Sequence, residues 1–282
     1  MARVDLPQSR VRAKRRKRRY IAGSVVFIIA LAVLGGLVWL SRAPFLRITA
    51  IQVSGEQTID PASVTDFVQN SIAGYRLFLF PKNNIFLYPQ AQIQHALPTA
   101  MPTIASVEVH AVNFHTIGVT VVERQPKALW CGASREASSS ECLLLDQSGA
   151  AYAPEGNGFS VEGQGTNGTY KRYFGALVGS TTPQQYLTPE EFTSLGALID
   201  ALAQNQQQEE LTDIEVDQNH DVRAYFTSGF ELIFALSSDG GDVYSRFQLA
   251  LQSDAFAGHT IDDFTYLDLR FGDRLYYKLK AQ

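Results

Sequence analysis

The sequence predicts an α+β protein with one N-terminal transmembrane helix, a small β-α-α-β-β domain, and a mixed α/β domain on a mostly antiparallel sheet. Three observations lead to this prediction. The segment Tyr20–Leu40 contains no charged residue. Beyond it, some segments repeat apolar residues at helical spacing, and others alternate apolar with polar residues as half-buried strands do. About 240 residues follow the apolar segment, which is room for two small domains.

The apolar segment Tyr20–Leu40 is long enough to cross a membrane. As an α-helix it would measure roughly 31 Å, and the hydrocarbon core of a bilayer is about 30 Å thick. Tyr20 and Trp39 stand at its ends, where aromatic rings favour the membrane interface. A cleaved signal peptide has an apolar region of only about 7–15 residues, and a buried core helix would carry a polar stripe. We therefore expect a retained membrane anchor.

Charge divides at this segment. Residues 1–19 hold nine Lys and Arg against one acid, Asp5, whereas only Arg42 and Arg47 follow the segment closely. Basic flanks stay in the cytoplasm, so the N-terminus should be inside and the rest outside. The remaining chain has 15 basic and 27 acidic residues, a balance that disfavours nucleic-acid binding. The basic arm resembles a nucleic-acid patch, but a topology signal at an anionic leaflet explains it fully.

The first outer domain is expected to have the order β-α-α-β-β. A strand at Phe45–Val53 should precede a helix with Asp60 as its N-cap and Pro61 at its first position. That helix should bury Val64, Phe67, Val68 and Ile72 and end near Gly74. An aromatic loop, Tyr75–Tyr88, a shorter helix near Pro89–Leu97, and strands at Ile104–Ala111 and Thr116–Glu123 should then follow.

The second domain is expected to begin near Pro126. Residues 156–185, which are rich in Gly, Thr, Asn and Gln, are predicted to be loop. Thr188 to Glu191 form a capping box for a helix that should bury Phe192, Leu195, Leu198, Ile199 and Leu202. The remaining predicted elements are strands at Asp213–Val216, Val222–Phe226 and Glu231–Leu236, a helix at Val243–Phe256, and strands at Phe264–Phe271 and Leu275–Lys280.

Several short motifs resemble those of the FtsQ/DivIB cell-division proteins, whose single N-terminal span is followed by a POTRA domain and a β domain. The matching segments are Ile51–Gly55, Ser106–Val109, Val122–Ala128, Leu144–Gly149 and Tyr266–Phe271. Within Val122–Ala128, residues Glu123, Arg124 and Pro126 meet the family pattern Glu-Arg-x-Pro-x-Ala. The resemblance implies four parts: a cytoplasmic basic arm (1–19), the transmembrane helix (20–40), a POTRA domain (45–125) and an FtsQ-type β domain (126–282).

This resemblance implies a scaffold of the bacterial divisome without catalytic activity. Its implied partners are FtsB/DivIC-like and FtsL-like bitopic proteins, which link it to septal cell-wall synthesis. It implies a single-pass plasma-membrane protein at the division septum, with no cofactor, nucleic acid or small-molecule substrate. One alternative is a membrane-anchored extracytoplasmic cell-envelope enzyme, which would need clustered polar residues in the second domain. Another is the POTRA region of an outer-membrane transporter, which the absence of later barrel strands disfavours.

No catalytic or metal-binding motif is complete in the sequence. His110 and His115 flank a predicted hairpin turn and fit no metal spacing. Asp217, Asn219 and Asp221 resemble the start of a calcium loop, but Val222 stands where glycine is needed. The segment Gly158–Gly163 misses the nucleophile-elbow spacing by one residue, and the glycosylation tripeptide at 167–169 is of a kind that arises by chance. An enzyme whose catalytic residues are scattered along the sequence would show no such motif.

Cys131 and Cys142 are the only cysteines, and both lie outside the membrane in the predicted topology. They bracket a polar loop between apparent strands at Lys127–Trp130 and Leu143–Leu145. A disulfide would pin this hairpin and is favoured over two free thiols in a reducing setting. The cysteines are not part of the family pattern.

The final hairpin is the predicted docking site for the partner. A three-residue loop pairs Phe271 with Leu275, Leu269 with Tyr277, and Leu267 with Leu279, and sets Asp268 opposite Lys278. A two-residue loop would mix these apolar residues with charged ones, so we predict the three-residue loop. The last strand should form an open edge, on which Tyr276→Pro and Tyr277→Pro should act differently. The predicted partner-binding residues are Tyr266, Leu267, Leu269, Phe271, Leu275, Tyr276, Tyr277 and Lys278.

Overall fold

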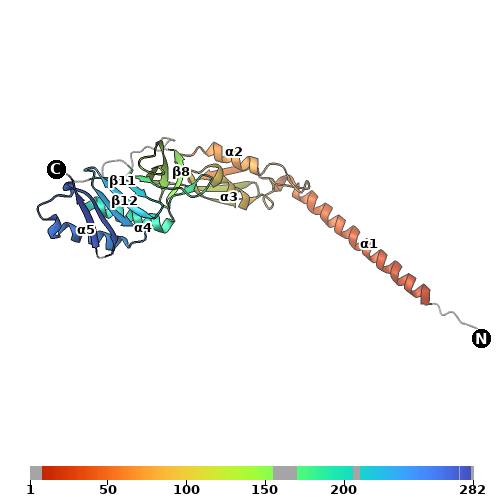
Figure 1. Ribbon diagram of the computed structural model, residues 1–282. Helices are drawn as coiled ribbons and strands as arrows, with labels where there is room; N and C mark the ends of the chain where they lie inside the picture. Colours follow the sequence, from red (N-terminus) through yellow and green to blue (C-terminus); the bar gives the residue numbers. More distant parts are fainter. Residues whose placement is uncertain (1–7, 155–169, 206–209, 273, 281–282) are drawn as a thin grey trace, which may run out of the picture. The chain divides into compact units, whose positions relative to one another are not determined.

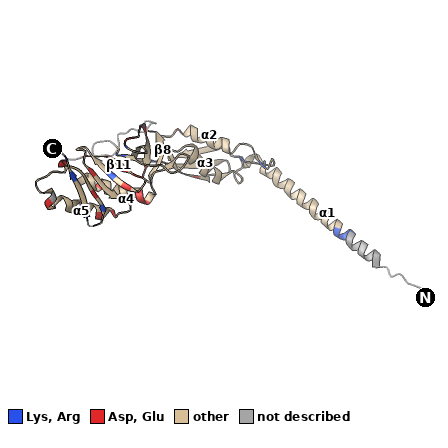
Figure 2. Ribbon diagram, in the orientation of Figure 1, with Lys and Arg blue, Asp and Glu red and all other residues tan. Residues whose placement is uncertain are grey.

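The computed structural model describes residues 8–154, 170–205, 210–272 and 274–280 and has an α+β fold. Its first element is a single long helix, α1 (Gln8–Ser41) (Figure 1). The part from Lys17 to Ser41 is long and apolar enough to cross a membrane, and none of its most apolar window is buried. In Figure 2 this part carries colour for charge only at its basic start. The predicted anchor, Tyr20–Leu40, lies within it.

The chain forms two compact units. The first comprises Met1–Gly55, Asp60–Leu97 and Val107–Val121, and the second comprises Glu56–Ile59, Pro98–Ser106 and Val122–Gln282. After α1, the elements in order are η1 (Pro44–Leu46), β1 (Ala50–Ser54), α2 (Pro61–Ser71), β2 (Tyr75–Arg76), β3 (Phe80–Pro81), α3 (Gln90–Ala100), β4 (Ile104–Ala111) and β5 (Thr116–Glu123). In the described residues, β1, β5 and β4 form a three-stranded sheet in that order, with β1 parallel to β5.

The start of β1 differs from the prediction of a strand at Phe45–Val53. Pro44 opens a 3-10 turn instead, and the strand begins only at Ala50. Leu46 and Ile48, within the predicted strand, are both buried and are held by packing without joining the sheet. In contrast, α2 begins where its signals predicted, because the Asp60 carboxylate accepts the Ala62 N–H at 3.0 Å.

A large mixed sheet organises the second unit. Its strands are β6 (Pro126–Gly132), β7 (Ser138–Asp146), β8 (Ala150–Pro154), β9 (Arg172–Phe174), β10 (Gln184–Gln185), β11 (Leu211–Val216), β12 (Asp221–Phe226), β13 (Glu231–Ala235), β14 (Phe264–Phe271) and β15 (Arg274–Leu279). Within the described residues their order is β10-β8-β7-β6-β9-β11-β12-β13-β14-β15. The pairs β6–β9, β9–β11 and β13–β14 are parallel, and the others are antiparallel.

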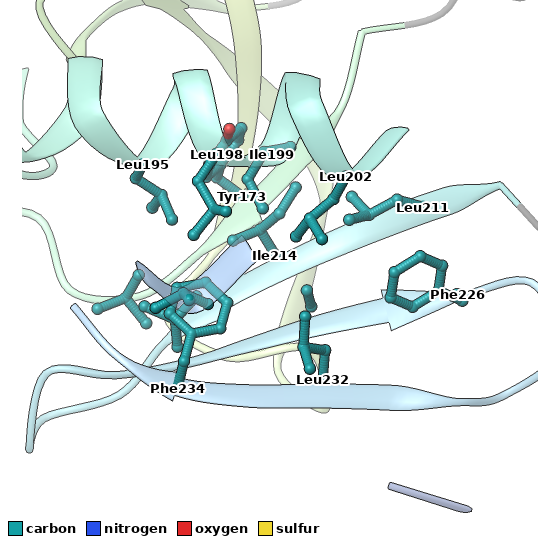
Figure 3. Packing of buried hydrophobic residues seen from close by; sticks show 14 of the residues in the cluster. Tyr173, Leu195, Leu198, Ile199, Leu202, Leu211, Ile214, Phe226, Leu232 and Phe234 are labelled. Carbon is teal, nitrogen blue, oxygen red and sulfur yellow. The ribbon is translucent and has the colours of Figure 1, made fainter. Parts of the chain in front are cut away.

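Two helices bury the apolar side of this sheet. They are α4 (Pro189–Asn205) and α5 (Gly240–Leu251), the latter followed by a 3-10 turn, Asp254–Phe256. Thr188 and Glu191 form the predicted capping box, with the Thr188 N–H donating to the Glu191 carboxylate at 3.0 Å. Figure 3 shows α4 packed over β11, β12 and β13, with Ile199 and Leu202 pointing at Ile214 and Leu232.

Two strands, β9 and β10, lie where loop was predicted. β9, within residues 156–185, joins β6 to β11 and so connects the two halves of the sheet. Three residues are too short to show periodicity, yet Tyr173 is buried on the helix side, and its ring packs against Phe192 at 5.5 Å between centroids. The Gly158–Gly163 segment and the tripeptide at 167–169 lie outside the described residues.

Candidate partner-binding edge

The hairpin formed by β14 and β15 lies at one end of the large sheet. β14 pairs with β13 on one side and with β15 on the other. In the part of the chain that the structure describes, β15 has no strand neighbour other than β14. Its second edge therefore presents backbone N–H and C=O groups to the surroundings, as an edge strand does.

The register of this hairpin corrects the prediction. Leu267 pairs with Tyr277, Asp268 with Tyr276, and Phe271 with Arg274, so the turn has two residues instead of three. The register shifts between Asp268 and Phe271, because β14 contains one residue more than β15 in this interval. Gly272 has a φ of 57°, a left-handed conformation that glycine adopts without a steric penalty and that suits such a tight turn.

The shift changes what the hairpin exposes. Leu267 and Leu269 are 0% and 2% exposed and lie in the main core, so they support the hairpin from below and are inaccessible to a partner. Leu275 packs against the same core and is half-buried. Phe271, however, is 52% exposed and packs edge-on against Tyr276, with 5.1 Å between ring centroids. A single added residue in β14 therefore moves Phe271 out of the predicted apolar face.

The outer strand carries a mixture of aromatic and basic side chains. Tyr276, Tyr277 and Leu279 are each more than two-fifths exposed, and Arg274 and Lys278 are also exposed. The Tyr277 ring rests on Phe256 and Phe264, with centroid distances of 6.3 and 5.7 Å. Tyr266 lies on β14 and is half-buried. Of the eight predicted partner-binding residues, Phe271, Tyr276, Tyr277 and Lys278 are the exposed ones.

An ion cluster fixes β14 to the sheet beside this edge. Arg270 contacts Asp268 at 2.6 Å and Asp221, on β12, at 2.5 Å. Burial alone would raise the pKa of the Asp268 carboxyl, but hydrogen bonds from the Arg270 side chain and backbone N–H outweigh burial and hold this pKa below its usual range. Hydrogen bonds from the guanidinium to Asp268 and Asp221 raise the pKa of Arg270. Arg246 of α5 donates to the Gly272 carbonyl and so anchors the turn.

Glu123 of the family motif has a structural role. Its carboxylate accepts the backbone N–H groups of Gln57, Thr58 and Ile59 at 2.6, 2.9 and 3.0 Å, and it also accepts the Thr58 hydroxyl. Glu123 is 6% exposed. Burial alone would raise its pKa, but these hydrogen bonds together lower it. Glu123 thus fixes the loop that leads into α2.

Arg124 connects two sequence motifs that are 22 residues apart. Its guanidinium donates to the Pro102 carbonyl at 3.0 Å and forms an ion pair with Asp146, from the Leu144–Gly149 motif. Asp146 also accepts the Ser148 and Ala150 N–H groups at 2.8 and 3.1 Å, forming the turn between β7 and β8. Pro126 is the first residue of β6 and pairs with Asp146. These contacts give the motif a role in packing.

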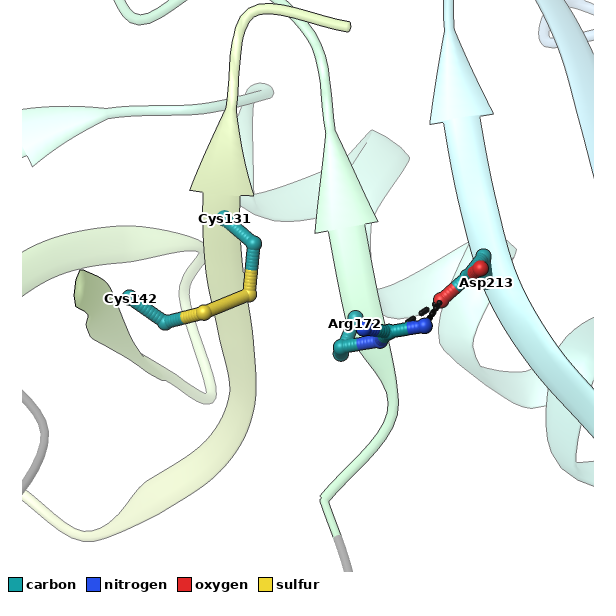
Figure 4. The surroundings of a disulfide bond; sticks show 4 residues. All are labelled: Cys131, Cys142, Arg172 and Asp213. Carbon is teal, nitrogen blue, oxygen red and sulfur yellow. Dashed lines mark hydrogen bonds and ion pairs between the residues drawn. A yellow bond between two sulfur atoms is a disulfide. The ribbon is translucent and has the colours of Figure 1, made fainter. Parts of the chain in front are cut away.

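Cys131 and Cys142 form a disulfide that joins β6 to β7 (Figure 4). Cys131 is 2% exposed and packs in a small cluster with Leu129, Leu144 and Phe174. Figure 4 also shows the neighbouring ion pair of Arg172 and Asp213, which joins β9 to β11 at 2.6 Å. The disulfide and this ion pair both hold strands around the centre of the sheet.

The described residues bring together no group of three or more His, Cys, Asp or Glu that could hold a metal ion. Asp217 instead closes the β11–β12 turn by accepting the Asn219 and Asp221 N–H groups at 2.8 and 3.0 Å. His110 and His115 are exposed, and His115 contacts the Arg47 carbonyl at 3.3 Å.

A hollow of about 470 Å³ lies beside α4, and its lining includes Lys127, Lys171 and Asp200. Burial lowers the pKa of the Lys171 amine, which is the chemical feature of this hollow that an enzyme could use. Lys127 pairs with Asp200 at 3.1 Å, an exposed contact.

Comparison with known proteins adds no family assignment. A scan against protein-family models finds no match, and a search of curated proteins finds none. The likeness to FtsQ/DivIB proteins therefore rests on the sequence motifs described above.

Proposed function

We propose that this protein is a bitopic scaffold of the bacterial divisome, anchored in the plasma membrane by α1 with its N-terminus in the cytoplasm. In this role it catalyses no reaction, acts at the septum, and links FtsB/DivIC-like and FtsL-like partners to cell-wall synthesis. Support comes from the basic arm before α1, from the order of elements that follows, and from the family motifs. We assign β1 to β5 with α2 and α3 to a POTRA domain on the same grounds.

The observation that carries the proposal is the open edge of β15. The Lys280 N–H donates to the Asp263 carbonyl at 2.8 Å, on the β14 side of the hairpin. Because N–H groups alternate in direction along a strand, those of Tyr276 and Lys278 point to β14, and those of Tyr277 and Leu279 point outward. A partner strand can pair with these outward groups, each net hydrogen bond contributing about 0.5–1.5 kcal/mol.

Two neighbouring proline substitutions test this edge. Lys278→Pro removes an N–H that faces β14 and should disrupt the hairpin, whereas Leu279→Pro removes an outward N–H and should leave the fold intact. We prefer Leu279 to Tyr277 because the Tyr277 ring packs on Phe256 and Phe264. The full-length Leu279→Pro protein should keep its circular dichroism spectrum and fail to capture an FtsB-like partner in a pull-down. Undiminished capture by folded Leu279→Pro would place docking elsewhere.

The second candidate is a membrane-anchored cell-envelope enzyme, favoured by the lowered pKa of Lys171 in the hollow beside α4. Lys171→Met removes the amine and keeps a long apolar side chain. If the protein is a scaffold, this variant should support division as the wild type does. Loss of division with an unchanged melting temperature would favour the enzyme.

A further inference from the structure

The short hairpin of β2 and β3 has an unusual turn. The Leu79 N–H donates to the Arg76 carbonyl at 3.2 Å, which closes a turn with Leu77 and Phe78 at its centre. Both central residues are left-handed, with φ of 51° and 60°. Tight hairpin turns of this kind favour Asn and Gly, because a Cβ atom is strained in this conformation. Two large apolar residues here are therefore unfavourable for the fold on its own.

The same residues are the most exposed apolar groups of the turn. Phe78 is 94% exposed and Leu77 is 77% exposed, while Tyr75 at the base is 60% exposed. Neither local strain nor exposure to water stabilises the folded chain. The two together indicate a surface made for contact with something apolar.

The hairpin is tied to the end of α1. Arg42, the residue after α1, donates from its guanidinium to the Leu79 carbonyl at 3.2 Å and lies 5.7 Å from the centre of the Tyr75 ring. The Asn84 side chain donates to the carbonyl of Ser41, the last residue of α1, at 2.8 Å. These contacts hold the turn next to the C-terminal end of α1, which is the end that would leave the bilayer.

The charge around the hairpin is basic only. Arg42, Arg47, Arg76 and Lys82 belong to this region, and the sequence has no Asp or Glu between Asp5 and Glu56 or between Asp66 and Glu108. A hollow of about 380 Å³, lined in part by Arg42, Arg47 and Tyr75, lies between the end of α1 and the hairpin. Its lining contains no acidic residue, although the chain beyond α1 is acidic overall.

We propose that the β2–β3 hairpin is a second membrane contact, in which Leu77 and Phe78 enter the outer interface of the bilayer and Arg42 and Arg47 bind phosphates of anionic lipids. Apolar and aromatic side chains bind at this depth, and nearby cations strengthen the binding to anionic headgroups. Lipid supplies the apolar surroundings that make the exposed turn favourable. The inference rests on the proposed membrane anchoring of α1 and extends it to the folded unit that follows.

Environment-sensitive probes on the full-length protein in proteoliposomes test this contact. Phe78→Cys, Ala30→Cys and Leu249→Cys are each labelled with a nitrobenzoxadiazole dye without reductant, so that the Cys131–Cys142 disulfide stays closed. Leu249 is an exposed apolar residue of α5, at 66%, and serves as the matched surface control. The probe at 78 should show blue-shifted emission and lose fluorescence to nitroxide-labelled lipids, as the probe at 30 does, and the probe at 249 should do neither.

The outcomes separate this inference from the anchor. Quenching at 30 without quenching at 78 overturns the hairpin contact and leaves the anchor in place, whereas no quenching at 30 overturns the anchor itself. A blue shift at 78 without lipid quenching means that protein covers the turn, which also refutes the proposal. Replacing phosphatidylglycerol with phosphatidylcholine should reduce quenching at 78 but not at 30. Equal quenching at 78 in both lipids would refute the proposed binding of anionic lipid phosphates by Arg42 and Arg47.

Discussion

Replacing Glu123 should lower the free energy of unfolding more than replacing an exposed glutamate does. Glu123→Ala removes the acceptor of three backbone N–H groups, those of Gln57, Thr58 and Ile59. Hydrogen bonds to a charged acceptor contribute about 1.5–3 kcal/mol each. Gln57 and Thr58 are exposed, so water can replace part of the loss. We therefore expect a destabilisation of about 2–4 kcal/mol, well below the sum of three such bonds.

Glu123→Gln separates the charge from the geometry. It keeps one carbonyl oxygen for the three N–H groups and should cost about 1–2 kcal/mol. The pKa of Glu123 is lowered from 4.5 in the folded protein, so its charge stabilises the fold fully above about pH 4.5. This stabilisation is lost as the pH falls through the lowered folded pKa. The difference in unfolding free energy between the wild type and Glu123→Gln should accordingly become smaller in acid.

Chemical denaturation of the full-length protein in detergent micelles, followed by circular dichroism, measures both variants. Glu108→Ala on β4 is the control, because Glu108 is exposed. It should change the unfolding free energy by no more than about 0.5 kcal/mol. A Glu123→Ala protein as stable as Glu108→Ala would refute the structural role of the motif glutamate.

Three further predictions concern other parts of the chain. Alkylation of denatured, unreduced protein should label neither Cys131 nor Cys142, and opening the disulfide should cost about 2–3 kcal/mol; labelling before reduction would contradict the bond. Arg270→Gln should lower the free energy of unfolding by about 2–4 kcal/mol at neutral pH, because buried Asp268 loses its ion pair. The pKa of Asp268 is lowered in the folded protein, so the loss should be smaller in acid, where Asp268 becomes protonated. A loss of stability that does not change with pH would count against this account. In spheroplasts, protease should digest residues after Leu40 and spare an N-terminal fluorescent fusion, and the reverse pattern would refute the orientation.

Elements that depend on residues close together in the sequence could be predicted from the sequence. The charge-free stretch predicted a helix long and apolar enough to cross a membrane. The Asp60 cap and the Thr188–Glu191 box marked the starts of α2 and α4, because a capping side chain bonds within three residues of itself. The alternating segments at Ile104–Ala111 and Thr116–Glu123 are strands with those bounds.

Features set by distant residues could not be predicted in this way. β9 is a strand because β6 and β11 pair with it from both sides, and its three residues carry no pattern of their own. The hairpin register differs from the prediction along its whole length, with Leu267 opposite Tyr277 instead of Leu279 and Asp268 opposite Tyr276 instead of Lys278. The apolar pattern carries no signal for the extra residue in β14 that accompanies the two-residue turn. Likewise, the motif residues Arg124 and Asp146 were visible separately, but their ion pair required the fold.

The most direct test of the divisome proposal is the behaviour of the protein in dividing cells. An N-terminal fluorescent fusion should gather at division sites, and depletion of the protein should block septation and give filaments. Wild-type protein and the Lys171→Met variant should restore division, whereas folded Leu279→Pro should not. Uniform membrane fluorescence together with normal septation after depletion would contradict the proposed function.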